Sequence, residues 1–448
     1  MDLHFPKGFL FGAATSAHQV EGGCTNNQWW EWEQTPGNVH DGSTSELACD
    51  HYRRYGEDFA LARDLGMNAQ RISVEWSRIE PEEGRFDEAE LDHYRDVCDT
   101  IRDLGMEPTV TLHHFTNPLW AQRQGGWENV KMIDWLARYS ERTAEALGDR
   151  VRFWFTINEP MVAPALCYVM GIHQPCVRDL ARALPVAKHV LLAHGAMYNA
   201  IKNAVAHVTE VGPVLQMPYI EALDPDDAAD REAAAQQDQL FNPDYLDGLL
   251  KGVVAPPVGD GAEVPGLARS YDMVGLNYYA RMLVRGGSLD GAQHPAGGAH
   301  EARDRELPLL GARRPSEPSP FKDQMGWEVY PEGLYSQLMR LDPLGCPVYV
   351  TESGMATRDD QARSRHLLAH LAEVHRAIRD GLDLRGFFYW TLMDNFEWAE
   401  GYTKTFGLIE IDRDDDLARR PRQAALLYRD IARARAISAE TLARHAVA

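Results

Sequence analysis

Two glutamates follow apolar, β-branched segments, and carboxyl groups in that position can do acid–base or nucleophilic chemistry. Residues 151–157 (VRFWFTI) lack a polar–apolar alternation, which is typical of a strand covered on both faces, and Asn158 and Glu159 come directly after them. Residues 347–353 (PVYVTES) form a second such segment, and Glu352 lies near its end. We therefore expect both carboxyl groups at the C-terminal ends of buried strands.

Glu159 and Glu352 are far apart in the chain, so only the tertiary structure can bring them together. A closed parallel barrel does so, because the C-terminal ends of all its strands meet at one face. Glycoside hydrolysis requires two carboxyl groups: one protonates the leaving oxygen, and the other attacks the sugar or activates water. Either glutamate alone could equally be a solvated residue at a strand end, but the pair favours the catalytic interpretation.

The elements that would position these side chains alternate along the chain. Helical patterns, two of which end at Gly66 and Gly105, separate eight apolar β-like segments. This alternation predicts an α/β fold, a single (β/α)8 TIM barrel domain comprising residues 1–448. Residues 285–320, rich in glycine, proline and charge, are predicted to be one of the long βα loops over the active site. The predicted strands are 9–15, 69–74, 107–112, 151–157, 211–219, 273–279, 347–353 and 384–392.

The composition and the absence of certain motifs argue against several partners. The formal net charge is −22 and no basic stripe stands out, which argues against nucleic acid and anionic membranes as partners. No signal peptide or membrane span is evident, and the six scattered cysteines form no CxxC pair, so we expect free thiols in a cytoplasmic protein. No GxGxxG, P-loop or HExxH motif occurs, so we expect no cofactor and no metal. The oligomeric state stays open.

Five motifs together resemble those of glycoside hydrolase family 1, the β-glucosidase family. They occur in the family's order and extend over nearly the whole chain: FPKGFLFGAATSAHQVEG, FTINEP, GLNYY, VTESG and YWTLMDNFEWAEGYTKTFGLI. NEP or TESG alone would be a weak signal, but five motifs in order are very specific. The resemblance implies a retaining exo-β-glycosidase that forms a covalent glycosyl-enzyme with a small-molecule β-glycoside or oligosaccharide.

The resemblance also implies roles for the residues around the two carboxyl groups. Glu159 matches the family's acid/base residue and Glu352 its nucleophile, while Arg71 and Tyr279 match residues that keep the nucleophile ionised. Asn158 is expected to donate to the sugar 2-hydroxyl, an interaction that strengthens in the transition state. Burial and the second carboxylate should raise the pKa of Glu159, which must hold a proton in the resting enzyme. Retention of configuration implies that the carboxyl groups lie roughly 5–5.5 Å apart.

The resemblance further implies a polar clamp and aromatic walls around the sugar. Polar side chains would bind the hydroxyls, and aromatic rings would stack on the apolar faces of the sugar. For any one of these side chains taken alone, core packing is the more ordinary interpretation, but the surrounding motif favours binding. His113 is expected to be structural, because adjacent side chains of a strand point apart. The expected substrate-binding residues are Gln19, His114, Asn277, Trp327, Trp390, Glu397, Trp398 and Phe406.

Two departures from the family pattern concern the aromatic lining. Phe115 and Thr116 stand where the family commonly has Trp-Asp, and Met161 stands where it commonly has an aromatic residue after NEP. Both changes thin the lining, so they leave the aglycone preference open while the chemistry is unaffected.

Several related functions are alternatives. The expected substrate is a β-D-glucoside, and β-galactosides and β-fucosides stay open because a Gln/Glu clamp often accepts sugars that differ at one hydroxyl. A transglycosylase would use the same residues. A non-catalytic carbohydrate-binding barrel is disfavoured because both glutamates are present, and a thioglucosidase is disfavoured because Glu159 is intact. Glu397, without a phosphate-binding set near it, argues against a 6-phospho-glycosidase.

Overall fold

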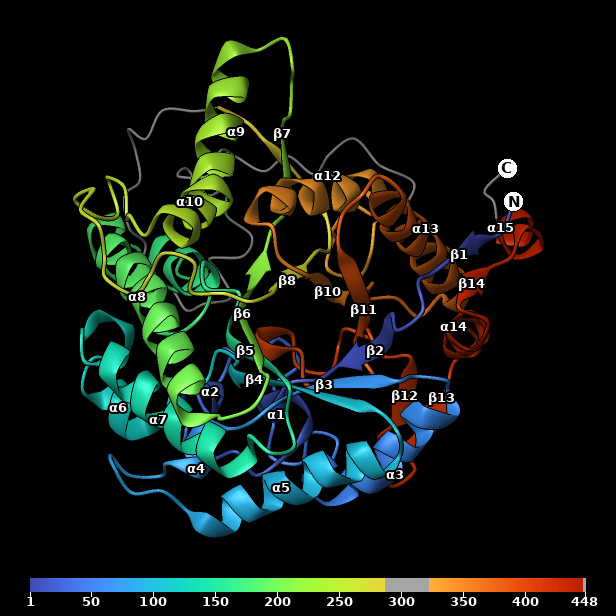
Figure 1. The fold of residues 1–448 in the computed structure, drawn as a ribbon, viewed down its shortest axis with the longest axis horizontal. Helices are drawn as coiled ribbons and strands as arrows, with labels where there is room; N and C mark the ends of the chain where they lie inside the picture. The colour runs from blue at the N-terminus through green and yellow to red at the C-terminus, as the bar shows by residue number, and fades with distance from the viewer. Residues whose placement is uncertain (287–321, 446–448) are drawn as a thin grey trace.

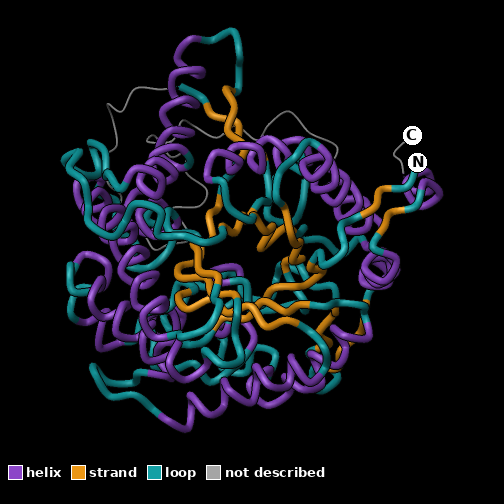
Figure 2. Tube along the Cα trace, viewed as in Figure 1, coloured by secondary structure: helices purple, strands orange, loops and turns teal. Residues whose placement is uncertain are grey.

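Eight parallel strands form a closed barrel in the computed structural model, which describes residues 1–286 and 322–445 (Figure 1). Figure 2 shows the barrel strands in orange at the centre, with purple helices around them. The barrel order follows the chain, and the last strand pairs with the first. The predicted (β/α)8 barrel is therefore confirmed. Its strands are β2 (Leu10–Ala14), β3 (Ala69–Ser73), β4 (Glu107–His113), β5 (Phe153–Asn158), β6 (Glu210–Gln216), β8 (Val274–Asn277), β10 (Val348–Ser353) and β11 (Leu384–Trp390).

Each barrel strand overlaps one predicted segment, and the largest difference falls in residues 211–219. There β6 ends at Gln216, and a separate strand, β7 (Tyr219–Ala222), pairs with β9 (Arg281–Val284) outside the barrel. Pro218 lies between the two strands, and proline has no N–H with which to continue a ladder. One apolar run thus forms two strands with different partners.

Several helices begin and end at residues with the expected capping chemistry. The side chains of Asp87 and Asp359 accept hydrogen bonds from the first-turn N–H groups of α5 and α13, and Gly66 and Gly105 follow α3 and α5 with φ +76°. The helices are α1 (Ala17–Val20), α2 (Gln28–Glu33), α3 (His51–Asp64), α4 (Trp76–Ile79), α5 (Glu88–Asp103), α6 (Leu119–Arg123), η1 (Gly126–Glu128), α7 (Met132–Leu147), η2 (Ala163–Val169), α8 (Leu180–Ala204), α9 (Ala228–Phe241), α10 (Pro243–Lys251), α12 (Pro331–Leu341), η4 (Asp342–Leu344), α13 (Asp360–Arg379), η5 (Trp398–Glu400), α14 (Gln423–Ala434) and α15 (Ala439–His445).

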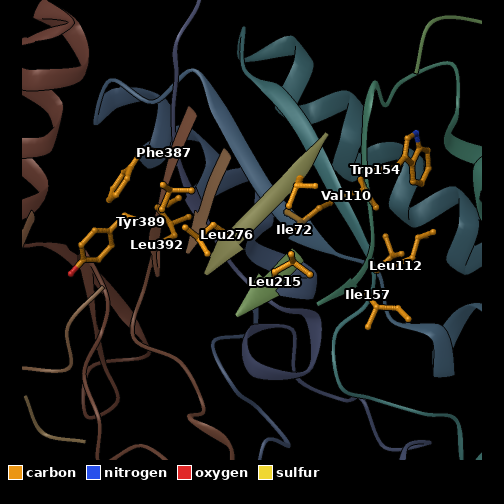
Figure 3. Close-up of a cluster of buried hydrophobic side chains, with 14 of the residues drawn as sticks. Ile72, Val110, Leu112, Trp154, Ile157, Leu215, Leu276, Phe387, Tyr389 and Leu392 are labelled. Atoms are coloured by element: carbon orange, nitrogen blue, oxygen red, sulfur yellow. The ribbon is translucent and has the colours of Figure 1, made fainter. Parts of the chain in front are cut away.

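Side chains of the barrel strands alternate between two environments. Ile72, Val110 and Leu276 belong to the main core, which also contains apolar residues of the surrounding helices, and Figure 3 draws part of this layer. Their chain neighbours Arg71 and Asn277 instead carry polar groups of the site described below. Alternation along the strands therefore separates the packed outer layer from the barrel interior, which holds these polar groups and a second, smaller apolar cluster.

The ends of the described chain meet beside the barrel. There β1 (Leu3–His4) pairs with β14 (Ala436–Ile437). A separate two-stranded pair outside the barrel joins β12 (Ile409–Asp412) and β13 (Ala418–Pro421), near α3 in Figure 1. The predicted loop 285–320 falls almost entirely outside the described residues. Among the helices of the described ranges, none is long and apolar enough to cross a membrane.

Candidate active site

One guanidinium group joins the strand ends that carry the two candidate catalytic glutamates. Arg71 on β3 donates from Nη1 to Glu352 Oε1 at 2.6 Å and from Nη2 to Asn158 Oδ1 at 2.7 Å. Glu352 lies on β10, and Glu159 comes directly after β5 with φ +49°, in the left-handed region. All four residues are more than nine-tenths buried. The barrel thus brings both carboxyl groups to one end, as the sequence predicted.

Strand β8 and the residues after it supply donors to both carboxyl groups. Tyr279 Oη donates to Glu352 Oε2 at 2.5 Å, and Asn277 Nδ2 donates to Glu159 Oε1 at 2.8 Å. Glu352 therefore has a cation and a phenol as side-chain donors, whereas the described residues give Glu159 only the amide of Asn277. Glu352 is therefore the carboxyl group with the stronger hydrogen-bond donors, and these donors stabilise its charged form.

These environments separate the pKa values of the two carboxyl groups. Burial, and then the charge of Glu352, raises the pKa of Glu159 to about 8. Burial also raises the pKa of Glu352 above its usual range, but Arg71 and Tyr279 oppose that rise. At neutral pH the proton of the pair therefore lies on Glu159, and Glu352 is the charged partner. This is the distribution that an acid and a nucleophile require.

Asn158 connects the carboxyl pair to His114. Its Oδ1 atom accepts from Arg71 and Asn277, so its Nδ2 atom is the donor in the 3.2 Å contact with His114 Nε2. His114 consequently carries its proton on Nδ1, and burial, followed by Arg71, keeps the pKa of the ring well below its usual range. Within the described chain, Nδ1 has no hydrogen-bond partner. A buried donor of this kind is suited to a ligand hydroxyl.

Gln19 on α1 and Glu397 after β11 form a second polar pair. Gln19 Nε2 donates to Glu397 Oε2 at 3.2 Å and to the backbone oxygen of Phe396 at 3.0 Å, and Ser16 Oγ donates to Gln19 Oε1 at 2.7 Å. Burial, followed by the charge of Glu352, raises the pKa of Glu397 to about 8. The pair presents an amide and a carboxyl group in fixed positions.

Four aromatic side chains surround these polar groups. Trp390 and Trp398 lie stacked at 5.9 and 6.3 Å from the His114 ring, and Trp327 lies 6.3 Å from Phe406. The last two rings both contact Tyr279, which connects them to the carboxyl pair. All the site residues predicted from the sequence therefore lie around one end of the barrel.

Two threonines that sequence analysis missed hold the polar groups in place. Thr111 Oγ1 accepts from Arg71 Nε at 3.0 Å, and Thr351 Oγ1 donates to Asn277 Oδ1 at 2.8 Å. Thr351 stands directly before Glu352, and a hydroxyl within a buried strand was a signal that it needs a polar partner.

Irregular pairing in two strands changes where their side chains point. The register of β10 shifts between Val350 and Glu352, and that of β5 shifts between Phe155 and Asn158. Such irregularities reorient a side chain that simple alternation would place on the other face. Thr351 and Glu352 are chain neighbours, yet both take part in the same polar network. Strand alternation alone therefore does not predict which residues face the site.

The described ranges contain no group of three or more His, Cys, Asp or Glu side chains that could hold a metal ion. The two adjacent histidines point apart: His113 Nε2 lies 2.9 Å from Asn117 Oδ1, whereas His114 contacts Asn158. His113 therefore has the structural position expected of it. No disulfide joins any of the six cysteines, all of which lie within the described residues.

A buried pair of carboxyl groups at the C-terminal end of a (β/α)8 barrel is the arrangement that suits one class of enzyme, the glycoside hydrolases that work with two carboxyl groups. The profile of glycosyl hydrolase family 1 matches residues 1–437. The chain belongs to glycosyl hydrolase family 1. The resemblance inferred from the five motifs is thus confirmed.

Relatives and solved structures are similar along nearly their whole length. Beta-glucosidase A of Thermotoga maritima is 35% identical over 436 residues, which covers 91% of this chain and 93% of the relative. The bifunctional beta-D-glucosidase/beta-D-fucosidase of Bifidobacterium breve is 34% identical over 455 residues, covering 92% and 95%. The structure of a beta-glycosidase from Pyrococcus horikoshii matches with a TM-score of 0.88 at 38% identity, covering 100% and 99% of the two chains. The beta-glucosidase from Thermotoga maritima in complex with glucoimidazole has a TM-score of 0.85 at 33% identity, covering 96% and 99%.

Proposed function

We propose that the protein is a retaining exo-β-glycosidase that hydrolyses β-D-glucosides by double displacement. The buried pair of Glu159 and Glu352 carries this proposal, because one carboxyl group holds a proton and Arg71 and Tyr279 hold the other one ionised. Relatives named beta-glucosidase support a glucoside, and the Bifidobacterium breve relative adds β-D-fucosides as a second sugar to test.

Glu159 would act as an acid in the first step and as a base in the second, while Glu352 is first the nucleophile and then the leaving group. In the first step, Glu352 attacks the anomeric carbon while Glu159 gives its proton to the leaving oxygen. The covalent glycosyl-enzyme removes the negative charge of Glu352, so the pKa of Glu159 falls and its carboxylate can act as a base. In the second step, Glu159 takes a proton from water, which attacks the anomeric carbon and releases the sugar with its configuration retained.

The remaining predicted residues would bind the sugar. Asn158 Nδ2 is the donor proposed for the 2-hydroxyl, and His114 Nδ1 offers a further buried donor. Gln19 and Glu397 together provide donors and acceptors for the hydroxyls on another side of the ring. Trp390 supplies an apolar wall for the C–H face of the sugar. This division of polar and aromatic groups suits a neutral monosaccharide.

We also infer that residues 1–448 form one domain in a reducing compartment such as the cytoplasm. The pairing of β1 with β14 ties the first residues to the last turn of the barrel, which supports one domain. Buried or half-buried free thiols such as Cys98 and Cys346 fit a reducing environment.

A panel of 4-nitrophenyl glycosides tests the proposed function. The sugars are the β-glucoside, β-galactoside, β-fucoside and β-mannoside, with the α-glucoside as a control for anomeric specificity. We expect hydrolysis of the β-glucoside, lost in Glu352→Gln and retained in Glu332→Gln, a matched change at an exposed glutamate. A folded protein that cleaves none of these substrates would contradict the proposal and favour a barrel used for binding alone.

Transglycosylation on the same site is the second candidate. It differs only in what attacks the glycosyl-enzyme, so the products must be compared with and without an added acceptor sugar. We expect glucose to be the main product at low acceptor concentration. A predominance of transfer products under those conditions would favour the transglycosylase.

A further inference from the structure

A tight turn of residues 323–327 lies before α12 and carries Trp327 at its end. The backbone N–H of Gly326 donates to the backbone oxygen of Asp323 at 3.0 Å, and the N–H of Asp323 donates to the backbone oxygen of Trp327 at 3.0 Å. Gly326 has a φ of +77°, in the left-handed region that favours glycine. The position of Trp327 therefore depends on how this turn is held.

The Asp323 carboxylate accepts hydrogen bonds from three backbone N–H groups. Its Oδ1 atom accepts from Met325 and Trp327, both at 2.9 Å, and its Oδ2 atom accepts from Ala356 at 3.3 Å. Burial raises the pKa of Asp323 to about 6, so the group is ionised at neutral pH. Hydrogen bonds to a charged acceptor are stronger than those between neutral groups. One side chain thus fixes both the turn and its contact with the loop after β10.

The next residue, Gln324, joins the same turn to two loops at the end of the barrel. Its backbone N–H donates to the backbone oxygen of Ala356 at 2.8 Å, in the loop after β10. Its Oε1 atom accepts from the backbone N–H and the hydroxyl of Thr405, both at 3.1 Å, and Lys404 Nζ donates to its backbone oxygen at 2.8 Å. Thr405 stands directly before Phe406, so the turn is also attached to the loop that carries this ring.

A charged pair holds the chain on the other side of Trp327. Arg281 donates from Nη2 to Glu328 Oε1 at 2.6 Å and from Nε to Glu328 Oε2 at 2.9 Å. Such a bidentate pair fixes geometry as well as distance. Arg281 comes two residues after Tyr279, at the start of β9. Trp327 is therefore held by Asp323 before it and by Glu328 after it.

The ring of Trp327 connects this turn to the candidate nucleophile. It lies 5.4 Å from the ring of Tyr279, which also lies 6.2 Å from the ring of Phe406. The hydroxyl of Tyr279 donates to Glu352 Oε2. Contacts between aromatic rings at these distances favour particular orientations. Displacement of Trp327 would remove one wall of Tyr279 and loosen a donor on which Glu352 depends.

We propose that Asp323 is a positioning residue for the glycosidase reaction: by holding the backbone of Trp327, it keeps the Tyr279 hydroxyl directed at Glu352. The inference rests on the proposed function, in which Glu352 is the nucleophile. Asp323 acts through two intervening rings, and Glu328 still holds the far side of Trp327 when Asp323 is lost. The effect should therefore be smaller than that of removing the Tyr279 hydroxyl itself.

Substitutions at Asp323 separate its contacts. Asp323→Ala removes all three acceptor contacts, whereas Asp323→Asn can keep Oδ1 for Met325 and Trp327 and gives up only the contact with Ala356. We expect kcat/KM for 4-nitrophenyl β-glucoside to fall by about three- to tenfold in Asp323→Ala and to stay within about twofold of native in Asp323→Asn. Asp323→Glu keeps the charge but displaces the oxygens, so it should lose activity in the same direction and serves if Asp323→Ala does not fold.

Asp87→Ala is the matched control. Asp87 Oδ1 likewise accepts from two backbone N–H groups, those of Ala89 and Glu90 at the start of α5. Its loss should lower stability in thermal unfolding and leave kcat/KM at the native value. A loss of activity in Asp87→Ala as large as that in Asp323→Ala would overturn the inference, because general destabilisation would then explain both.

A double-mutant cycle with Trp327→Ala tests the route. If Asp323 acts through Trp327, Asp323→Ala should change kcat/KM by less than about twofold in the Trp327→Ala background, because contacting residues in one network are not additive. Losses of equal size in both backgrounds would show that Asp323 acts by another route, which overturns the inference.

The position of Trp327 can also be measured without activity. The chain has 11 tryptophans, so fluorine NMR of protein labelled with 5-fluorotryptophan needs the Trp327 resonance to be assigned, as the one missing from Trp327→Phe. We expect this resonance to shift or broaden in Asp323→Ala and to keep its native position in Asp323→Asn and Asp87→Ala. An unchanged resonance in Asp323→Ala overturns the inference.

The outcomes separate this inference from the proposed function. Absence of cleavage by the native protein overturns the proposed function and the role of Asp323 in it. Native cleavage that is unchanged in Asp323→Ala, or that falls equally in Asp323→Asn, overturns only the role of Asp323. A loss in Asp323→Ala that Asp323→Asn restores, together with a moved Trp327 resonance, supports the assignment.

Discussion

Tyr279 Oη donates a 2.5 Å hydrogen bond to Glu352 Oε2, although the two residues lie 73 positions apart in the chain. They come from neighbouring strands of the barrel, since Glu352 on β10 pairs with Asn277 on β8. A phenol that donates to a carboxylate stabilises the charged form of that carboxylate. The barrel thus places a donor where a nucleophilic carboxylate needs one.

Tyr279→Phe tests this contact. A hydrogen bond to a charged group contributes about 1.5–3 kcal/mol, so we expect kcat/KM for the β-glucoside to fall by about 10- to 100-fold. The pKa of Glu352 should rise, because the hydrogen bond from Tyr279 lowers it, and the acidic limb of the pH profile should move to higher pH. Tyr278→Phe is the control: Tyr278 Oη donates to the backbone oxygen of Tyr330 at 2.6 Å, away from the carboxyl pair. Equal losses in both variants would contradict a specific role for Tyr279.

The alkaline limb of the activity profile should report Glu159. Its pKa is raised to about 8, so kcat/KM of the free enzyme should fall as pH rises past that value and the acid loses its proton. 2,4-Dinitrophenyl β-glucoside has a leaving group that needs no acid. When Glu159→Gln cleaves this substrate, the rate of the first step should not fall at alkaline pH. A limb that persists in this variant would have to come from another group, of which Glu397 is the first candidate.

Removing the charge of Glu159 should stabilise the protein at alkaline pH. The pKa of this group is higher in the folded protein than in the unfolded chain, so its stabilising contribution is present below about pH 4.5 and is lost as pH rises towards about 8. Glu159→Gln should therefore unfold at a higher temperature than the native protein at pH 8.5, by the equivalent of about 2 kcal/mol, and at an unchanged temperature at pH 4.5. Thermal unfolding at the two pH values measures this. A gain of equal size at both would contradict the ionisation of Glu159 as its cause.

A pair of stacked histidines on α13 should make the protein sensitive to acid. The rings of His366 and His370 lie 3.8 Å apart, and neither ring nitrogen of His366 has a hydrogen-bond partner in the described part of the chain. Burial lowers the pKa of His370 to about 4, and burial with the charges of His370 and Arg363 lowers that of His366. Their stabilising contribution is present above the ordinary histidine pKa of about 6.5 and is lost as pH falls towards about 4.

His366→Phe tests this effect. The variant keeps an aromatic ring in the stack and removes the group that must be protonated, so it should unfold at a lower pH than the native protein. Unpartnered buried polar atoms cost about 1–3 kcal/mol, so the free energy of unfolding at pH 5 should rise by about 1 kcal/mol or more. Denaturant unfolding at pH 5 and pH 7.5 measures it, with exposed His207→Phe as the control. If His366→Phe unfolds in acid at the same pH midpoint as the native protein, other groups, such as buried His194, control acid unfolding.

The sequence by itself determined the eight strands and the family. Apolar β-branched runs and helical spacing are local patterns, and each strand formed where such a run occurs because burial on both faces favours it. The motifs also placed Glu159 and Glu352 at strand ends, as in FTINEP and VTESG. Only the split of residues 211–219 into β6 and β7 departed clearly from the prediction, since local apolar character does not specify which partner a strand will find.

The tertiary structure alone decided which side chains meet and what their charges do. Thr111 and Thr351 belong to the site through contacts with Arg71 and Asn277: a hydroxyl in a buried strand signals that it needs a polar partner, but not which partner it finds. The pKa of Glu159 depends on burial and on Glu352, a residue from a distant part of the chain. The space beside Glu159 likewise depends on how α2, η2, α8 and the segment after β4 pack around it. Burial, charge coupling and empty space are properties of neighbours in three dimensions, and short-range sequence patterns do not encode them.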